Sequence, residues 1–381
     1  MAPRRTVLRI REVLLLLAFG VAALVITFSP ANSFRPMGTA PPVQLQQGGE
    51  LHGKEILSST LIPPTTPCPA SRAMLPKSFK IACVGDSITY GNGTHVKKKE
   101  REHEGSYPLE LKFLLEHGIP GSSSGATVGC PKLERTILED IRRQLQPSGG
   151  HDGCSRCDGI DKNSNGVVKY TVKNFGKSGR TASPKMRKFS IRHTAEFNAS
   201  KAYQPQLVII LLGTNDSKKR HWEGAEGFKQ YYRSLILLYV ENYRLRMNRS
   251  GVGAGDGFPN LPLYVQLVLP PPATAAEGKE GVVMMIDGNV IAKEIVPAVK
   301  ELSEELSQEH GGDGGSSLNL HVFREPVDLF TPFSKEIEGF TGVKKKTRQG
   351  GLSNHLLHDG VHPTVLGHQR IAEQVYRSLC L

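Results

Sequence analysis

The chain has 381 residues, 38% hydrophobic and 22% charged, and carries a formal net charge of +12 at pH 7. This composition is typical of a soluble globular protein with room for one large domain or two smaller ones. The charge would suit an anionic partner, but dense lysine runs occur only at 97–99 and 344–346. Neither run is interleaved with aromatic residues and we find no nucleic-acid-binding motif, so we expect no nucleic-acid partner.

The N-terminus has the pattern of a secretory targeting segment. Four arginines within the first eleven residues precede an uncharged stretch from Val13 to Phe28, and small residues follow at Ala31 and Ser33. This pattern predicts a signal peptide or an uncleaved signal anchor over residues 1–33. We therefore expect the protein in the secretory pathway, either secreted or membrane-anchored through this segment alone.

The segment that follows residue 33 is predicted to be a stalk or linker. Residues 34–76 are rich in proline, glycine and serine and show no sustained hydrophobic period. The folded domain should then span residues 77–381. It should begin with a buried strand that starts at Lys80 and ends at Gly85.

A helix is predicted next, from Tyr107 to His117 and closed by Gly118. Five apolar residues are expected to form its broad apolar face: Leu109, Leu111, Phe113, Leu114 and Leu115.

Residues 118–167 interrupt the pattern and are predicted to be an insertion. They contain glycine and serine tracts and one predicted helix at 132–145. Long loops of this kind are usually functional or disordered, so the insertion is either a lid over the active site or a disulfide-tied excursion. Residues 161–166 resemble the start of a calcium loop, but Val172 occupies the position of the bidentate glutamate, which favours a simple turn.

Strands and helices alternate again after the insertion. The predicted strands or extended segments are 167–176, 206–213, 261–272 and 318–330, and the predicted helices are 228–247, 287–311 (one helix or two) and 362–379. Strands separated by helices predict a parallel sheet with right-handed crossovers, covered on both faces. The fold class is therefore α/β.

The predicted compartment is oxidising, so the six cysteines are considered first as candidates for disulfide bonds. Cys83 lies in an apolar run and is expected to be a buried free thiol or a strained disulfide partner. The other five are disulfide candidates whose pairing stays open: Cys68, Cys130, Cys154, Cys157 and Cys380. No second CxxC and no histidine pair accompany Cys154 and Cys157, so we predict no metal site there.

Four asparagines fit the N-glycosylation pattern and suggest a glycoprotein, although the pattern is frequent by chance. They are Asn92, Asn198, Asn215 and Asn248.

A polar cluster follows three of the predicted strands, and a fourth cluster precedes the last helix. They are Gly85-Asp86-Ser87, Asn174-x-Gly176-x-x-Gly179, Gly213-Thr214-Asn215-Asp216 and Asp359-Gly360-Val361-His362. Loops at the carboxyl edge of a parallel sheet converge on one crevice, so we expect these clusters to meet.

These residue types suit an acyl-transfer site. Ser87 would be the nucleophile, His362 the base that accepts its proton, and Asp359 the carboxylate that orients the imidazole. The backbone N–H groups of Ser87 and Gly179 and the side-chain amide of Asn215 would form an oxyanion hole. Each cluster alone is also explained by a turn or a helix cap, but four in this order predict a catalytic site.

Two more acidic residues lie in these clusters. We expect Asp86 and Asp216 to brace their loops by accepting hydrogen bonds rather than to take part in the reaction. Pro363 favours His362 over the nearby His358 as the base, because proline can open the final helix and fix the residue before it. The remaining histidines are expected at the surface or in caps, among them His355, His358 and His368.

The four clusters resemble the blocks of the SGNH (GDSL-type) hydrolases, which appear here as "GDSITYG", "NFGKSGRT", "LGTNDS" and "DGVHP". The likeness covers residues 79–381 apart from the insertion. The "GTNDSK" stretch followed by Trp222, the "LPPP" strand end and "DGNVI" look like secreted GDSL esterases associated with sialate or carbohydrate O-acetyl esters. The resemblance implies a flavodoxin-like three-layer α/β/α sandwich, the residue roles given above, and no metal or organic cofactor.

The sequence therefore predicts a serine esterase of the secretory pathway that cleaves short acyl or O-acetyl groups, including those on glycans. Two alternatives stay open. An acyltransferase would use the same triad, and a non-catalytic binding module would keep the fold without the reaction.

Overall fold

The structure is a computed structural model that describes residues 76, 78–94, 105–119, 130–145, 168–249, 261–275, 282–311, 319–340, 345–346 and 352–381. The predicted targeting segment and all but the last residue of the stalk lie outside the described residues, as do Cys68, Cys154, Cys157 and the predicted turn at 161–166. Within the described ranges, we find no helix with the length and apolar character needed to cross a membrane.

The centre of the fold is one sheet of five parallel strands in the order β2-β1-β3-β4-β7. The strands are β1 (Ser78–Gly85), β2 (Lys169–Gly176), β3 (Leu207–Leu211), β4 (Leu263–Val268) and β7 (Leu320–Val322). The predicted parallel sheet is therefore confirmed, and β1, which leads to Ser87, lies between β2 and β3.

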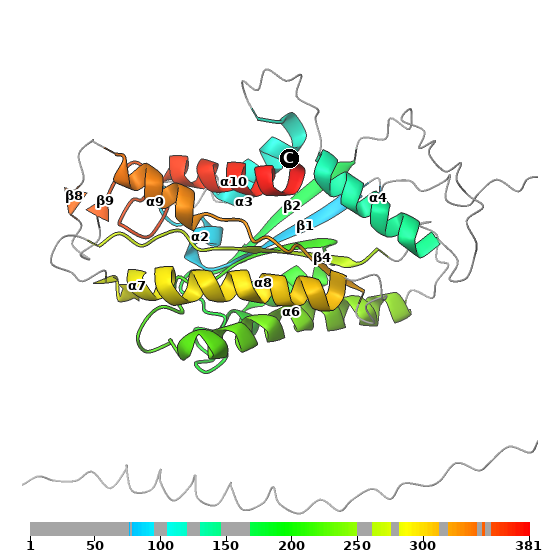
Figure 1. The fold of residues 1–381 in the computed structure, drawn as a ribbon, viewed down its shortest axis with the longest axis horizontal. Coiled ribbons are helices and arrows are strands. Elements are labelled where there is room, and N and C mark those ends of the chain that lie inside the picture. Colours follow the sequence, from blue (N-terminus) through cyan, green and yellow to red (C-terminus); the bar gives the residue numbers. More distant parts are fainter. Residues whose placement is uncertain are drawn as a thin grey trace, which may run out of the picture. The chain divides into compact units, whose positions relative to one another are not determined.

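Helices cover both faces of this sheet (Figure 1). One face carries α3 (Tyr107–His117), α4 (Pro131–Leu145), α9 (Phe330–Glu338) and α10 (Val365–Cys380). The other carries α5 (Ala195–Ala202), α6 (Gly224–Arg249) and α8 (Val296–Gly311), the last preceded by α7 (Gly288–Val290) and a π-helical turn, η3 (Ile291–Ile295). This arrangement is the expected three-layer α/β/α sandwich.

The short elements connect these layers. They are α2 (Ser87–Tyr90), the 3-10 turn η2 (Ile191–His193), the hairpin of β5 (Val282–Val283) and β6 (Ile286–Asp287), and the hairpin of β8 (Lys345–Lys346) and β9 (Leu352–Ser353).

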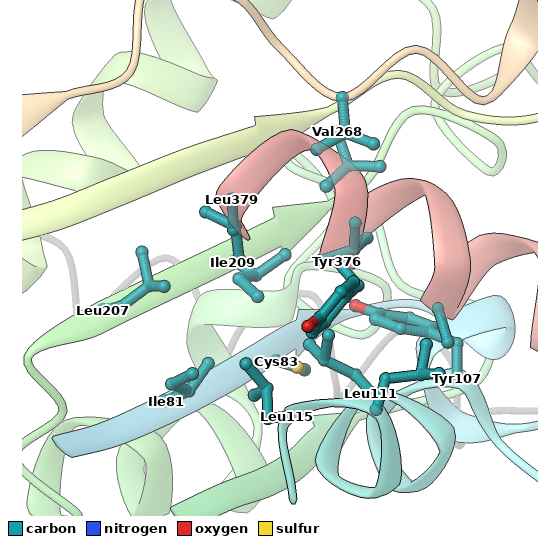
Figure 2. Close-up of a cluster of buried hydrophobic side chains, with 14 of the residues drawn as sticks. Ile81, Cys83, Tyr107, Leu111, Leu115, Leu207, Ile209, Val268, Tyr376 and Leu379 are labelled. Carbon is teal, nitrogen blue, oxygen red and sulfur yellow. The ribbon is translucent and has the colours of Figure 1, made fainter. Parts of the chain in front are cut away.

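Successive residues of the central strands point to opposite faces, so each strand supplies two cores. In β1, Ile81 and Cys83 belong to the core under α3 and α10, whereas Ala82 and Val84 belong to the core under α6 and α8. Burying one large apolar side chain contributes roughly 1.5–3 kcal/mol. Figure 2 shows the first core, with side chains from β1, α3 and α10 that include Ile81, Cys83, Tyr107, Leu111, Tyr376 and Leu379.

Helix α3 has the predicted bounds but a narrower buried face than predicted. Leu111, Leu114 and Leu115 are buried, whereas Leu109 and Phe113 are 39% and 48% exposed. An apolar stripe at helical spacing covers only the side that meets the sheet, so the two outer residues remain on the solvent side.

The predicted helix of the insertion is α4, and it packs into the core at the end of the sheet away from Ser87. The Tyr170 hydroxyl donates to Glu134 Oε1 at 2.8 Å, and the Tyr264 hydroxyl donates to Asp140 Oδ2 at 2.8 Å. Both tyrosines are the second residues of their strands, whereas Ser87 follows the carboxyl end of β1. Helix α4 is therefore not a lid over Ser87, and the insertion's remaining residues at 120–129 and 146–167 lie outside the described residues.

A disulfide joins Cys130, just before α4, to Cys380 at the end of α10. Cys83 is free and buried, as the apolar run predicted. Burial raises the pKa of its thiol to about 12, so the thiol stays protonated and unreactive.

We predict that Cys130→Ala lowers the free energy of unfolding by about 2–5 kcal/mol, because the crosslink restricts the unfolded chain between positions 250 residues apart. Urea unfolding measures this change. The matched control is to unfold both proteins in a thiol reductant, where neither has the Cys130–Cys380 crosslink and the two midpoints should coincide. Equal midpoints without reductant would contradict a stabilising disulfide.

Candidate active site

Ser87 is held by a sharp turn at the end of β1. Asp86 caps α2, with its Oδ1 accepting a hydrogen bond from Ile88 N at 2.9 Å, and Ser87 is the first residue of that helix. Gly85 is required at the strand end, because a Cβ there would lie 2.4 Å from the Leu211 carbonyl oxygen. The turn brings the Ser87 backbone N–H to a helix N-terminus, where the first N–H groups have no partner within the helix.

The structure brings Ser87 together with His362 and Asp359. Ser87 Oγ lies 3.0 Å from His362 Nε2, although the two residues are 275 positions apart. His362 Nδ1 lies 2.7 Å from Asp359 Oδ2. Asp359 Oδ1 accepts hydrogen bonds from the backbone N–H groups of Val361 and His362 at 3.0 and 2.8 Å, which fixes the carboxylate relative to the ring.

The Asp359 carboxylate is stabilised in its charged form. Burial alone would raise its pKa, but the hydrogen bonds and charge of His362 outweigh burial and lower it. An ionised Asp359 accepts the Nδ1 proton of His362 and leaves the Nε2 lone pair directed at Ser87 Oγ. This is the tautomer that a base for the serine hydroxyl needs.

The predicted oxyanion residues come from two other strand ends. Asn215 is 3% exposed, and its Nδ2 donates to Asp86 Oδ2 at 3.2 Å, which leaves the second amide hydrogen for another acceptor. Gly179 has a φ of +75°, which favours glycine. Its loop is tied to the end of β1 because Lys177 N donates to the Gly85 carbonyl at 2.9 Å.

Two of the possible glycosylation sites lie close to this site. Asn215 is buried and hydrogen-bonded to Asp86, so it is not accessible for a glycan. Asn92 is half-buried, and its Nδ2 donates to Ser178 Oγ at 3.1 Å in the Gly179 loop.

Asp86 and Asp216 both accept hydrogen bonds from their loops. Asp86 binds Ile88 N and the Asn215 amide, and burial raises its pKa to about 6. Asp216 Oδ1 accepts from the backbone N–H groups of Ala182 and Ser183 at 2.9 and 3.3 Å. Asp216 therefore joins the loop after Gly179 to the strand end that carries Asn215.

One contact near the site was not predicted. His221 is 5% exposed, and its Nδ1 lies 2.9 Å from the backbone carbonyl of Asn215. Burial lowers the pKa of His221 despite this hydrogen bond, so the neutral ring donates from Nδ1 and fixes the Asn215 loop. Nothing in the sequence distinguishes His221 from the other histidines.

The prediction that His368 lies at the surface or in a cap is wrong, because the residue is inside α10, whose N-cap is Thr364. It is fully buried on the inner side of α10, and its Nε2 lies 3.1 Å from the Asn92 carbonyl. Burial lowers its pKa to about 4, so the ring is neutral and acts as a structural donor.

His358 is exposed and His355 lies 3.4 Å from Glu336, so neither replaces His362 beside Ser87. The described residues contain no group of three or more His, Cys, Asp or Glu side chains that could hold a metal ion.

We predict a pH effect on stability from Asp216. Burial and the nearby Asp86 carboxylate raise the pKa of Asp216 to about 7, whereas an aspartate in the unfolded chain has a pKa of about 3.9. Between these values the folded state binds more protons than the unfolded state, so this group makes the free energy of unfolding fall as the pH rises from about 4 to about 7.

Asp216→Asn removes this titration while its side-chain oxygen can still accept from Ala182 and Ser183. Urea unfolding at several pH values should therefore show that the variant loses less stability than the wild type across this range. Asp287→Asn, which changes the cap of α7, is the matched control. Equal pH dependence in wild type and Asp216→Asn would contradict the prediction.

The sequence matches known proteins over most of its length. A sequence model of the family described as GDSL-like Lipase/Acylhydrolase matches residues 81–375. The chain is 28% identical over 296 residues to an acetylxylan esterase of Xylanibacter ruminicola. That match covers 78% of this chain and 42% of the relative, so the chain spans less than half of that protein's length.

Solved structures of carbohydrate esterases are similar at lower identity. Est24, a carbohydrate acetylesterase from Sinorhizobium meliloti, is 19% identical with a TM-score of 0.36, and the match covers 79% of this chain and 97% of that one. The acetyl xylan esterase AlAXEase is 15% identical with a TM-score of 0.38, and the match covers 79% and 100%. The family assignment rests on the match over residues 81–375, which is more than half of the chain. The protein therefore belongs to the GDSL-like lipase/acylhydrolase family.

Proposed function

We propose that the protein is a serine esterase that removes short acyl groups, chiefly O-acetyl groups of glycans, through a covalent acyl-enzyme. The observation that carries this proposal is the continuous chain of contacts from Ser87 Oγ to His362 Nε2 at 3.0 Å and from His362 Nδ1 to Asp359 Oδ2 at 2.7 Å. Both distances lie within the range of productive proton transfer.

In the first step, Ser87 Oγ attacks the acyl carbon while His362 Nε2 accepts the hydroxyl proton. Asp359 stabilises the imidazolium that forms. The carbonyl π electrons move to the oxygen, which becomes an oxyanion. When this tetrahedral intermediate collapses, the bond between the acyl carbon and the alcohol oxygen breaks, and His362 returns its proton to the departing alcohol.

In this proposal three donors hold the oxyanion. They are the backbone N–H groups of Ser87 and Gly179 and the free amide hydrogen of Asn215. The Asn215 amide is oriented by Asp86, and its backbone is held by His221. Such fixed donors stabilise developing charge at no reorganisation cost, and each contributes about a hundred- to a thousandfold in rate.

Water completes the cycle. It attacks the acyl-enzyme carbon and gives its proton to His362 Nε2, and the second intermediate collapses to release the carboxylic acid as Ser87 Oγ regains its proton. The ester thus becomes one acid and one alcohol, and the enzyme returns to its starting state.

The substrate and the location are parts of the same proposal. The acetylxylan esterase relative supports an acetyl group on a polysaccharide as the substrate. The Cys130–Cys380 disulfide supports an oxidising compartment, in agreement with the targeting pattern at residues 1–33. We therefore propose that the enzyme acts in the secretory pathway or outside the cell.

Covalent labelling and acyl-chain preference test this proposal on the chain purified from a secreting host. A fluorophosphonate should phosphonylate Ser87 with loss of fluoride, and peptide mass spectrometry should locate the adduct there. The enzyme should hydrolyse p-nitrophenyl acetate faster than the butyrate and palmitate esters. Labelling at another residue would contradict the nucleophile, and a preference for palmitate would contradict the short-acyl substrate.

A further inference from the structure

A basic hollow lies beside the loop that carries Gly179. Its volume is about 580 Å³, which is within the roughly 300–1,000 Å³ of small-ligand sites. The charged and titratable side chains that line it are Lys177, Arg180, Arg187, Lys188, His193 and Glu196. Four permanent cations thus surround one carboxylate.

The single carboxylate of the hollow is already paired. Glu196 Oε1 lies 2.6 Å from Lys177 Nζ. Burial alone would raise the pKa of Glu196, but its hydrogen bond and ion pair with Lys177 lower it, so it remains an anion bound to that lysine. Arg187 and Lys188 are exposed, and no acidic side chain among the described residues forms an ion pair with either. The side chains that line the hollow therefore carry a positive charge that no acidic side chain among the described residues neutralises.

Backbone hydrogen bonds fix the loop that carries Arg187 and Lys188. Thr181 N donates to the Phe189 carbonyl at 2.9 Å, and Ile191 N donates back to the Thr181 carbonyl at 3.0 Å, which closes the loop at its base. The Arg180 guanidinium donates to the Lys188 carbonyl, while its buried Nε has no partner. The amino end of α5 also faces the hollow, and its partial positive charge adds to that of the side chains.

The hollow is connected to the proposed active site through two short links. Lys177 lines the hollow, and its backbone N–H binds Gly85, two residues before Ser87. Arg180 follows Gly179 directly, and Ala182 and Ser183, two and three residues further along, belong to the loop that Asp216 holds beside Asn215. A glycan with its acyl group at Ser87 could therefore place a neighbouring substituent against the cations.

We propose that this basic hollow binds an anionic group of the substrate, a carboxylate or a sulfate on the sugar that carries the ester or on its neighbour. The inference rests on the proposed esterase function and narrows its substrate class to acidic glycans. Guanidinium groups bind carboxylates and sulfates through paired charge-assisted hydrogen bonds, and the guanidinium of the exposed Arg187 is not in an ion pair with any acidic side chain that the structure describes.

Three matched substrates test the inference: O-acetylated methyl glucoside, the corresponding glucuronoside, and the glucoside 6-sulfate. The variant Arg187→Ala/Lys188→Ala should lower the ratio of kcat/KM for an anionic sugar to that for the neutral sugar by at least about tenfold, mainly through KM. The control Lys169→Ala/Lys300→Ala removes two exposed lysines of β2 and α8 and should leave the ratio at its wild-type value. Unfolding midpoints of both variants check that the fold is intact.

The same sugars without the acetyl group, used as inhibitors of p-nitrophenyl acetate hydrolysis, give a second measurement of binding. A loss confined to the glucuronoside or to the sulfate supports the inference and identifies the anion. A wild type that neither hydrolyses nor binds the anionic sugars better than the neutral one would overturn it, as would an unchanged ratio in the double variant. If Ser87→Ala retained wild-type hydrolysis of all three sugars, the esterase proposal itself would fail.

Discussion

Replacing Ser87 by alanine will lower kcat for p-nitrophenyl acetate by about a millionfold, which is the scale of losing the nucleophile in serine hydrolases. The reason is that Ser87 Oγ, 3.0 Å from His362 Nε2, is the proposed nucleophile, and alanine has no atom to replace it. Steady-state hydrolysis by equal amounts of the two purified proteins measures this loss. The free energy of unfolding should fall by no more than about 1 kcal/mol, since the side-chain hydrogen bond lost among the described residues is the one to His362.

Ser303→Ala is the matched control for this loss. Ser303 is also buried, and its hydroxyl donates to the Phe323 carbonyl at 2.8 Å, far along the chain from the proposed site. This variant should lose about 1 kcal/mol of stability from the broken hydrogen bond and keep its kcat. If Ser87→Ala kept most of the wild-type rate, the serine mechanism would be wrong, whatever the family.

The central strands could be predicted because they are short apolar runs that end at glycine or proline. The strand predicted at 206–213 is β3, two residues shorter at its end and one at its start. The two hairpins β5-β6 and β8-β9 were not predicted, because strands of two residues have no hydrophobic period to detect. The π-helical turn at Ile291–Ile295 likewise depends on how α8 meets the sheet and not on local composition.

The convergence of the four polar clusters could be predicted from topology alone. Parallel strands end at one edge, so residues that follow them meet there whatever their separation in the chain. The individual hydrogen bonds could not be predicted in this way. The bond from Asn215 to Asp86 and the one from His221 to the Asn215 carbonyl depend on loop paths that have no sequence signal.

The wrong prediction for His368 could have been avoided by asking which face of the final helix the residue occupies. Once α10 is placed, His368 lies on the same face as the buried residues Ile371, Ala372 and Val375. A histidine on the inner face of an amphipathic helix is expected to be buried and to need a partner, which here is the Asn92 carbonyl. A histidine considered only by residue type is assigned too easily to the surface.

Asp359→Asn is expected to lower kcat by about ten-thousandfold while changing KM little. The asparagine oxygen can still accept from the backbone N–H groups of Val361 and His362, so the turn should persist. Its amide, however, would face His362 Nδ1 as a donor, which forces the ring proton to Nε2. That tautomer cannot accept the Ser87 proton, and the positive imidazolium would also lose its counter-charge.

The measurement is kcat for p-nitrophenyl acetate across the pH range, with circular dichroism to check the fold. Asp328→Asn is the matched control, because Asp328 Oδ1 accepts from Thr331 N at 2.9 Å in a similar turn before α9 but has no contact with the proposed triad. That variant should keep its kcat.

Near-normal activity in Asp359→Asn would show that the 2.7 Å contact to His362 positions the loop and does not set the tautomer. Residual activity that is low but well above that of Ser87→Ala would instead separate the two roles, since the nucleophile would remain and only its base would be misprotonated.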